Sequence, residues 1–218
     1  MTRAVHSEPL TLAGPAGELE AAADLPQGSP RAVAVVCHPH PQQQGTMENK
    51  VVTTLARAFA RLGAVALRFN FRGVGRSAGM YADGSGERDD VIAVTHFART
   101  RWPGLSLYLG GFSFGAAVAL TATTSVEPRG LVTVAPPIAR LPATFVPPRC
   151  RWLLVHGMAD EVVPPQPVVE WARALARPPQ LVLLDGVGHF FHGKLKTLDD
   201  AVTEFFGAEL GGVQSAAS

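Results

Sequence analysis

The sequence predicts an α/β protein with one mostly parallel sheet and helices on both of its faces, and three observations carry this prediction. Several short apolar runs are continuous, as expected for strands that are covered on both faces. Segments with helical spacing separate these runs, and parallel neighbours need such crossover connections. The first 30 residues differ, because two runs joined by a Gly-Pro-Ala-Gly turn predict an N-terminal antiparallel hairpin.

The strands follow directly from the apolar runs. The hairpin is expected at residues 9–14 and 17–25. Buried strands are expected at residues 32–37, 64–71, 105–112, 130–135, 151–156 and 180–185. Because ligands of open α/β sheets bind beyond the carboxyl ends of the strands, the residues after each run are the candidates for function.

The helix predictions rest on apolar stripes at helical spacing. A stripe from Val51 to Leu62 is followed by Gly63, a residue typical of the position after a helix C-terminus. The last apolar stripe, from Leu198 to Phe206, begins within a pattern from Thr197 to Asp200 that is typical of a helix N-terminus. Further helices are expected at residues 87–101, 166–177 and 198–206.

Composition limits the class of protein and its partners. At 218 residues with 47% hydrophobic content, residues 1–210 can form one domain, and residues 211–218 are expected to be a flexible tail. A net charge of +1 gives no reason to expect nucleic acid, and no run is apolar enough for a membrane helix. The start lacks a secretory signal, and Cys37 and Cys150 lack a redox or metal spacing, so a cytoplasmic protein with reduced thiols is expected. Monomer and homodimer both stay open.

The stretch from Gly111 to Gly115 reads G-x-S-x-G, with Ser113 at its centre, and it lies between an expected strand and a helix rich in alanine. A nucleophile elbow turns so sharply that side chains two positions from the serine would collide with the turn, and glycine removes the collision. An ordinary tight turn is the alternative interpretation, and the strand before and helix after it favour the elbow.

A serine nucleophile needs a base within hydrogen-bonding reach and an acid that orients the base. In the chain order serine, acid, histidine, Asp160 and His189 follow two successive strands and are expected at the same sheet edge. Asp160 competes with Glu161 and Asp185, and His189 competes with His192. Position after the strand favours Asp160, and the glycine-spaced loop favours His189.

An oxyanion hole would need two backbone N–H groups. The amide of Phe114, directly after the serine, is one candidate. Pro39 and Pro41 have no N–H, which makes His40 the candidate for the second donor in the loop after the first parallel strand. His38 and His40 could also chelate a metal, but no cluster of further ligands accompanies them, so no metal is expected.

Together these features resemble the α/β-hydrolase superfamily, and in particular its small lidless bacterial serine hydrolases. The similar stretches, spread over residues 38–196, are "HPHP", "GTMENKVV", "FNFRGVGRSAG", "GSGERDD", "GGFSFGA", "VHGMADEVVP" and "GHFFHGKL". The resemblance implies an α/β-hydrolase fold and serine-esterase activity, with Ser113 as nucleophile, His189 as base, Asp160 as acid and an oxyanion donor at or near His40. It also implies a relation to dienelactone hydrolases, whose nucleophile is a cysteine; their substrate cannot be transferred to a serine enzyme.

The substrate pocket is less well defined by the sequence. The chain between Ser113 and Asp160 is already used by a helix, a strand and a proline-rich stretch, which leaves no room for a lid. An open site favours short acyl chains, and the acyl pocket is expected to involve an aromatic and methionine set, although core packing is an equal alternative for each member. This set is Phe112, Phe114, Phe190, Phe191, Met47 and Tyr81.

The glycine-rich turn in "RFNFRGVGRSAG" does not fit dinucleotide binding, because its glycine spacing is one residue too long, and no cofactor is expected. Arg72 or Arg76 in this turn is instead expected to be held by carbonyls or carboxylates. The sequence therefore predicts a hydrolase of small-molecule esters. A thioesterase or acyltransferase, an aminopeptidase that would use Glu48 or Glu87 to bind an amine, and a non-catalytic binding module are the alternatives.

Overall fold

The computed structural model describes residues 5–211, which form one eight-stranded sheet in the order β1-β2-β4-β3-β5-β6-β7-β8. β1 and β2 are an antiparallel hairpin, β2 is also antiparallel to β4, and every other neighbouring pair is parallel. The predicted sheet with its N-terminal hairpin is confirmed. The strands are β1 (His6–Gly14), β2 (Gly17–Leu25), β3 (Ala32–Cys37), β4 (Ala64–Phe69), β5 (Ser106–Phe112), β6 (Gly130–Val134), β7 (Arg151–Gly157) and β8 (Gln180–Leu184).

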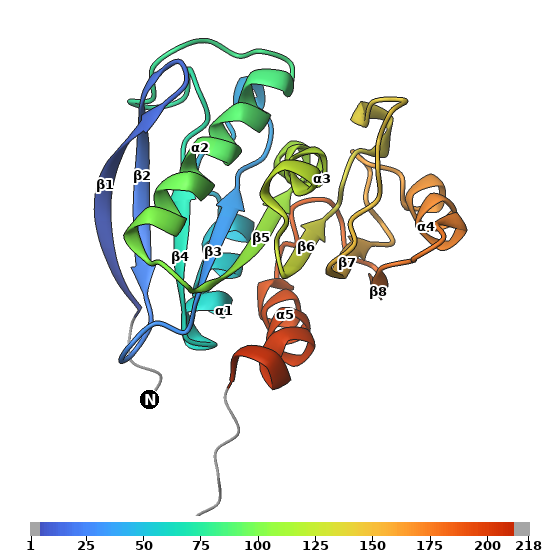
Figure 1. The fold of residues 1–218 in the computed structure, drawn as a ribbon. Coiled ribbons are helices and arrows are strands. Elements are labelled where there is room, and N and C mark those ends of the chain that lie inside the picture. The colour runs from blue at the N-terminus through green and yellow to red at the C-terminus, as the bar shows by residue number, and fades with distance from the viewer. Residues whose placement is uncertain (1–4, 212–218) are drawn as a thin grey trace, which may run out of the picture.

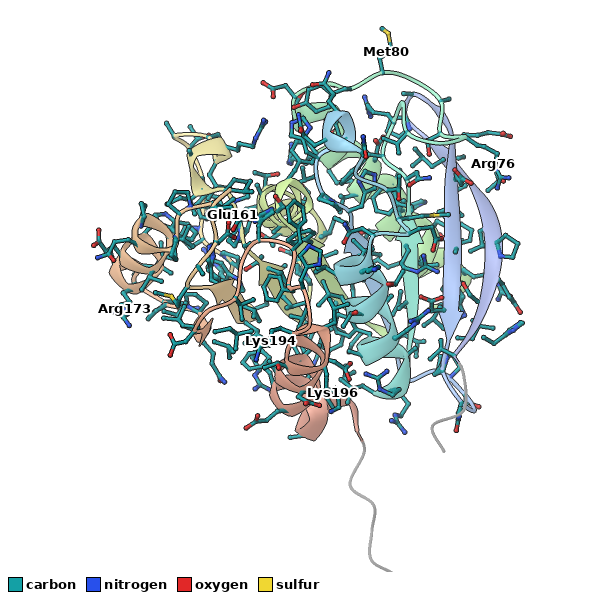
Figure 2. The ribbon with its side chains drawn as sticks, turned by 180° about the vertical axis from the view of Figure 1, so that it is seen from behind. Arg76, Met80, Glu161, Arg173, Lys194 and Lys196 are labelled. Carbon is teal, nitrogen blue, oxygen red and sulfur yellow. The ribbon has the colours of Figure 1, made fainter. Side chains whose placement is uncertain are left out.

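Helices cover both faces of the sheet. Figure 1 shows α2, α3 and α4 on the side of the sheet nearer the viewer, and Figure 2 looks from behind onto α1 and α5, with Lys194 and Lys196 at the start of α5. The helices are α1 (Lys50–Arg61), α2 (Ser85–Arg101), α3 (Phe114–Val126), α4 (Pro165–Ala174) and α5 (Leu195–Leu210), with short 3₁₀ turns η1 (Pro41–Gln43) and η2 (Ile138–Arg140).

The continuous apolar runs are explained by two cores, one on each face. In β3, Val33, Val35 and Cys37 pack into the core under α2 and α3, whereas Ala32, Ala34 and Val36 pack into the core under α1 and α5. Alternate residues of a strand point to opposite faces, so a strand between two helix layers must be apolar throughout. The loops that follow the parallel strands meet at the upper edge of the sheet in Figure 1.

Two sequence predictions were wrong in detail. β8 is an edge strand and Leu181–Leu184 are only half-buried, so it is not fully covered on both faces. α5 begins at Leu195 after Lys194, with no side-chain cap, so Thr197 lies inside the helix and does not cap it. A hydrogen-bonded turn, in which the Lys194 amide donates to the Phe191 carbonyl (3.0 Å), leads directly into α5, so the helix begins earlier than the pattern predicts. Gly211 closes α5, and the remainder of the predicted tail, 212–218, lies outside the described residues.

The helices within residues 5–211 are all too short or too polar to cross a lipid bilayer. The two cysteines in this range are both free thiols, and Cys37 is fully buried in β3 as its position in an apolar run predicts. Burial raises the pKa of the Cys37 thiol, which keeps it protonated and unreactive.

Candidate active site

Ser113 occupies a strained turn between β5 and α3. Its φ is 52° and its ψ is −121°, a backbone conformation that a residue other than glycine adopts only when the surrounding structure holds it there. The flanking glycines are required by close backbone approach. A Cβ on Gly111 would lie 2.4 Å from the Gly115 carbonyl oxygen, and a Cβ on Gly115 would lie 2.3 Å from the carbonyl oxygen of His38. The collision that the sequence predicts at an elbow is therefore present on both sides of the serine.

The structure brings Ser113, His189 and Asp160 together, although they are far apart in the chain. His189 Nδ1 lies 2.8 Å from Asp160 Oδ2, and His189 Nε2 lies 3.0 Å from Ser113 Oγ. An ionised carboxylate can only accept, so Nδ1 carries the proton and donates it to Asp160. Nε2 is then the acceptor for the Ser113 hydroxyl. This tautomer is the one in which an imidazole can take a proton from serine.

The turn after β7 holds the Asp160 carboxylate in place. Asp160 Oδ1 accepts hydrogen bonds from the amides of Val162 (2.9 Å) and Val163 (2.7 Å). Burial alone would raise the pKa of Asp160, but the hydrogen bonds from His189 and these amides together hold that pKa below its usual value. The competing carboxylates, Glu161 and Asp185, are exposed and belong to the solvated surface.

The two predicted oxyanion donors are neighbours in space. The rings of His40 and Phe114 have centroids 4.9 Å apart. Phe114 is the first residue of α3, where an amide has no partner inside the helix, and His40 caps η1. The loop after β3 and the elbow after β5 therefore meet beside Ser113.

Comparisons with known proteins identify the family of this chain. A family model described as "Serine aminopeptidase, S33" matches residues 28–152. An α/β serine hydrolase without a lid from Xanthomonas campestris is 43% identical, covers 95% of this chain and 97% of its own, and has a TM-score of 0.90. The chain belongs to the α/β serine hydrolases.

Two other solved structures have the same fold as this hydrolase. An α/β serine hydrolase homologue from Coxiella burnetii is 38% identical with a TM-score of 0.87, and covers 93% of this chain and 99% of its own. An esterase from Pyrococcus furiosus, 18% identical, shares the fold with a TM-score of 0.79 over 95% of this chain and 92% of its own. Within residues 5–211 no lid domain is inserted between the elements of the sheet and its helices, as the sequence predicts. The predicted relation to dienelactone hydrolases stays a prediction.

Two further buried histidines support the site without touching Ser113. His38 donates from Nδ1 to the Pro39 carbonyl (2.6 Å), and its Nε2 accepts the amide of Phe71 (3.0 Å). Burial lowers the pKa of His38 to about 4. His156 Nε2 donates to the Val163 carbonyl (3.0 Å). Both rings join one strand end to a neighbouring loop, and both nitrogens of His38 are already used, which argues against the metal interpretation.

The predicted pocket residues divide into two groups. Phe112, Phe190 and Phe191 line a cavity of about 390 Å³ beside the His189 loop. Phe112 and Phe191 are fully buried and also belong to the core, whereas Phe190 is 50% exposed and packs edge-on against His189. Met47 is nearly buried and does not line this cavity, because Asn70 Oδ1 accepts the Met47 amide (2.8 Å) and fixes that loop.

The glycine-rich turn after β4 forms the ion pairs that the sequence predicts. Arg72 pairs with the buried Asp90 at 2.7 Å, and Arg76 pairs with Glu20 at 3.0 Å. Burial raises the pKa of Asp90 even though Arg72 opposes the shift. Figure 2 shows Met80 projecting from the outer end of the loop that follows, where it is 83% exposed.

The sequence did not predict a polar cluster around the Phe114 ring. Tyr81 Oη lies 3.2 Å from His40 Nε2 and 3.0 Å from Asp83 Oδ1, and Arg140 Nη1 lies 3.2 Å from the same carboxylate oxygen. The Arg140 guanidinium also stands over the Phe114 ring at 5.5 Å. Arg140 comes from η2, in the proline-rich stretch that enters the sequence prediction only as part of the chain that leaves no room for a lid.

Proposed function

We propose that this hydrolase cleaves short-chain carboxylic esters, with Ser113 as the nucleophile, His189 as the base and Asp160 as the acid. The observation that carries the proposal is the continuous hydrogen-bonded chain of 3.0 Å and 2.8 Å through both nitrogens of His189. A serine hydroxyl is a weak nucleophile at neutral pH, and an adjacent oriented imidazole is the group that activates it.

The reaction proceeds in two steps. Ser113 Oγ attacks the ester carbonyl carbon while its proton moves to His189 Nε2, and the carbonyl oxygen becomes negative. The C–O bond then breaks, and the alcohol leaves with the proton from His189. Water repeats the attack on the acyl-enzyme: its proton goes to His189, its hydroxyl goes to the acyl carbon, and Ser113 recovers its proton as the acid leaves. No step calls for a metal or a cofactor.

The oxyanion is proposed to accept hydrogen bonds from the amides of Phe114 and His40. Phe114 directly follows Ser113, and the 4.9 Å separation of the His40 and Phe114 rings supports the proposal by placing the loop of His40 beside the elbow. Preformed donors of this kind stabilise the developing charge without reorganisation, at a gain of about 3 kcal/mol for each donor.

The description of the matching family model raises aminopeptidase activity as the second candidate. A peptide amine would need a free acidic side chain. Glu87 does not supply one, and Glu48 is 64% exposed but already binds a guanidinium. Glu87 is fully buried and accepts the amides of Ala82 (2.9 Å) and Gly84 (2.8 Å), and Glu48 pairs with Arg68 at 2.9 Å. This favours esters over peptides.

The proposal is tested by fluorophosphonate labelling and by turnover of p-nitrophenyl esters of increasing chain length. The wild type should be labelled and should prefer short chains, and Ser113→Ala should lose the label and about 10⁴-fold or more in kcat. Ser106→Ala, at the other end of the same strand, is the matched control and should keep both. Equal turnover by wild type and Ser113→Ala would remove the serine from the mechanism. A matched thioester and an alcohol acceptor separate thioesterase and acyltransferase activity from ester hydrolysis.

A further inference from the structure

A groove runs along α3 from the residue directly after Ser113. Its first part is a cavity of about 520 Å³ whose α3 wall includes Phe114, Ala117 and Thr121. A smaller cavity of about 250 Å³ shares Arg88, Thr121 and Pro142 with it and extends the groove to Thr124. At 1.5 Å per residue, this helix face is about 15 Å long. In Figure 1 the segment after β6 rises beside α3 and forms the outer wall.

The charged side chains that line the first cavity have a net positive charge. Arg140 is paired with Asp83 at 3.2 Å, so their charges compensate each other. The second guanidinium, that of Arg88, donates to the Thr121 carbonyl (3.2 Å) and to Ser125 Oγ (2.7 Å), and both acceptors are neutral. Within residues 5–211, no carboxylate lies within salt-bridge distance of Arg88. The groove therefore carries one positive charge that the protein holds in place but does not neutralise.

The part of the wall that α3 supplies between Ser113 and Arg88 is apolar, because it consists of Phe114, Ala117 and Val118. The paired Arg140 and Asp83 also line the cavity, but their charges compensate each other. Thr121, which holds Arg88, follows Ser113 by eight residues, or about 12 Å along the helix. A ligand for this groove thus needs an ester at one end, an uncharged chain and an anion at the other end. A carboxylate fits a guanidinium in particular, since the two can form parallel charge-assisted hydrogen bonds.

The chemistry of the proposed reaction decides which part of the ester lies in the groove. His189 returns its proton to the leaving oxygen, so the alcohol must leave on the His189 side, where Phe190 and Phe191 border the other cavity. The acyl chain then points away from His189, along α3.

We propose that this groove selects acyl chains that end in a carboxylate, and that Arg88 is the residue that binds this carboxylate. The inference rests on the proposed ester hydrolysis and narrows its substrate class to half-esters of dicarboxylic acids. It also gives a physical reason for the proposed preference for short uncharged chains, because a long chain that ends in a methyl group would cover the Arg88 guanidinium without replacing its hydration. Hydrolysis adds water across the acyl C–O bond and releases the diacid and the alcohol.

The substrate test compares p-nitrophenyl esters of matched length. The mono-ester of octanedioic acid places its carboxylate about 9 Å from the ester carbonyl, which leaves room for a hydrogen bond to Arg88. In the wild type we expect kcat/KM for this ester to exceed that for the octanoate ester by about tenfold or more, and to lose this advantage in high salt. In Arg88→Met the ratio should fall to about one. Arg101→Met, at the exposed end of the same helix, removes the same charge and should leave all rates unchanged.

A second measurement is independent of turnover. Octanedioate should bind Ser113→Ala protein in calorimetry, and the double variant Ser113→Ala, Arg88→Met should bind it about tenfold more weakly. If butanoate esters are hydrolysed but the ratio stays at one in the wild type, or survives in Arg88→Met, the carboxylate preference is wrong and ester hydrolysis stands. If no ester is hydrolysed, the proposed function is wrong, and equal binding of octanedioate by the two variants overturns the groove as well.

Discussion

The two sides of Ser113 are built differently. On one side, the side chains of His189 and Asp160 are 4% and 0% exposed, and the structure gives a partner to both nitrogens of His189 and both oxygens of Asp160. On the other side, Arg140 and Asp83 are 40% and 84% exposed and meet in an open network. The first side fixes the geometry of a reaction, and the second leaves charge in contact with water.

This difference indicates that the two sides have different roles, one in the reaction and the other in substrate binding. A hydrogen bond to a buried charge costs several kcal/mol to break, because the remaining partner is left unpaired away from water. An exposed ion pair contributes about 0–1 kcal/mol and is screened by salt. Changes on the buried side should therefore abolish turnover or alter stability strongly, and changes on the open side should only adjust which substrates bind.

The largest effect is expected from Asp160→Asn. The amide can donate to His189 Nδ1, which would move the ring proton to Nε2 and leave no acceptor for the Ser113 hydroxyl. We expect kcat to fall about 10⁴-fold, as the loss of tautomer control predicts. Steady-state turnover with circular dichroism as a check of folding measures this. The neighbouring exposed Glu161→Gln is the control and should turn over normally; a loss below tenfold for Asp160→Asn would remove the acid from the mechanism.

A smaller effect on the buried side comes from His38. Its pKa of about 4 in the folded protein lies below the ordinary value of 6.5, so the unfolded chain binds the proton more readily between these values. Stability should thus be complete above about pH 6.5 and fall as the pH drops to about 4, by about 3 kcal/mol from this residue. Urea unfolding at several pH values measures the slope.

The matched variants separate His38 from other acid-sensitive groups. His38→Gln should flatten the slope between pH 6.5 and 4, whereas His96→Gln, an exposed position, should keep it. The buried His156, whose pKa burial also lowers, contributes in both proteins and cancels in the difference. An unchanged slope in His38→Gln would mean that His38 binds a proton as readily in the folded protein as in the unfolded chain.

The features that the sequence predicted are those set by local rules. The glycines beside Ser113 are demanded by contacts within the elbow and with the adjoining strand end, so the pentapeptide itself reveals them. Asp160 and His189 were predictable because both follow parallel strands, whose carboxyl ends share one edge. Chain order and strand ends are enough to bring these residues to one place.

The features that the sequence missed depend on how separate elements pack. Arg88 faces the groove because α2 packs against α3 and brings Thr121, 33 residues away, under its guanidinium. Met47 was predicted to be a pocket residue, but its backbone amide donates a hydrogen bond to Asn70 Oδ1, which follows another strand, and this contact fixes the loop. Glu87 was considered for amine binding, although its position three residues after Gly84 already fits a carboxylate that caps a helix.

Glycine variants test how tightly the elbow is packed, through their effect on the free energy of unfolding. Gly115→Ala would place a Cβ 2.3 Å from a backbone oxygen of the adjoining loop, which cannot move aside as a side chain could. We expect a loss of about 1–3 kcal/mol in the free energy of unfolding. Gly207→Ala, inside α5 with open space around it, is the matched control and should stabilise by about 0.5–1 kcal/mol. Thermal unfolding of both variants gives the two signs, and a stable Gly115→Ala would contradict the close contact at the elbow.

The smallest effect is expected on the open side, at the pair of Asp83 and Arg140. A double-mutant cycle with Asp83→Asn and Arg140→Gln should give a coupling energy below about 1 kcal/mol that decreases in high salt, because both side chains are solvated. Urea unfolding of the four proteins measures it. A coupling above about 2 kcal/mol that salt does not weaken would mean that this network is as rigid as the Asp160 side. The two sides of Ser113 would then not divide reaction geometry from substrate selection, because both would hold their groups fixed.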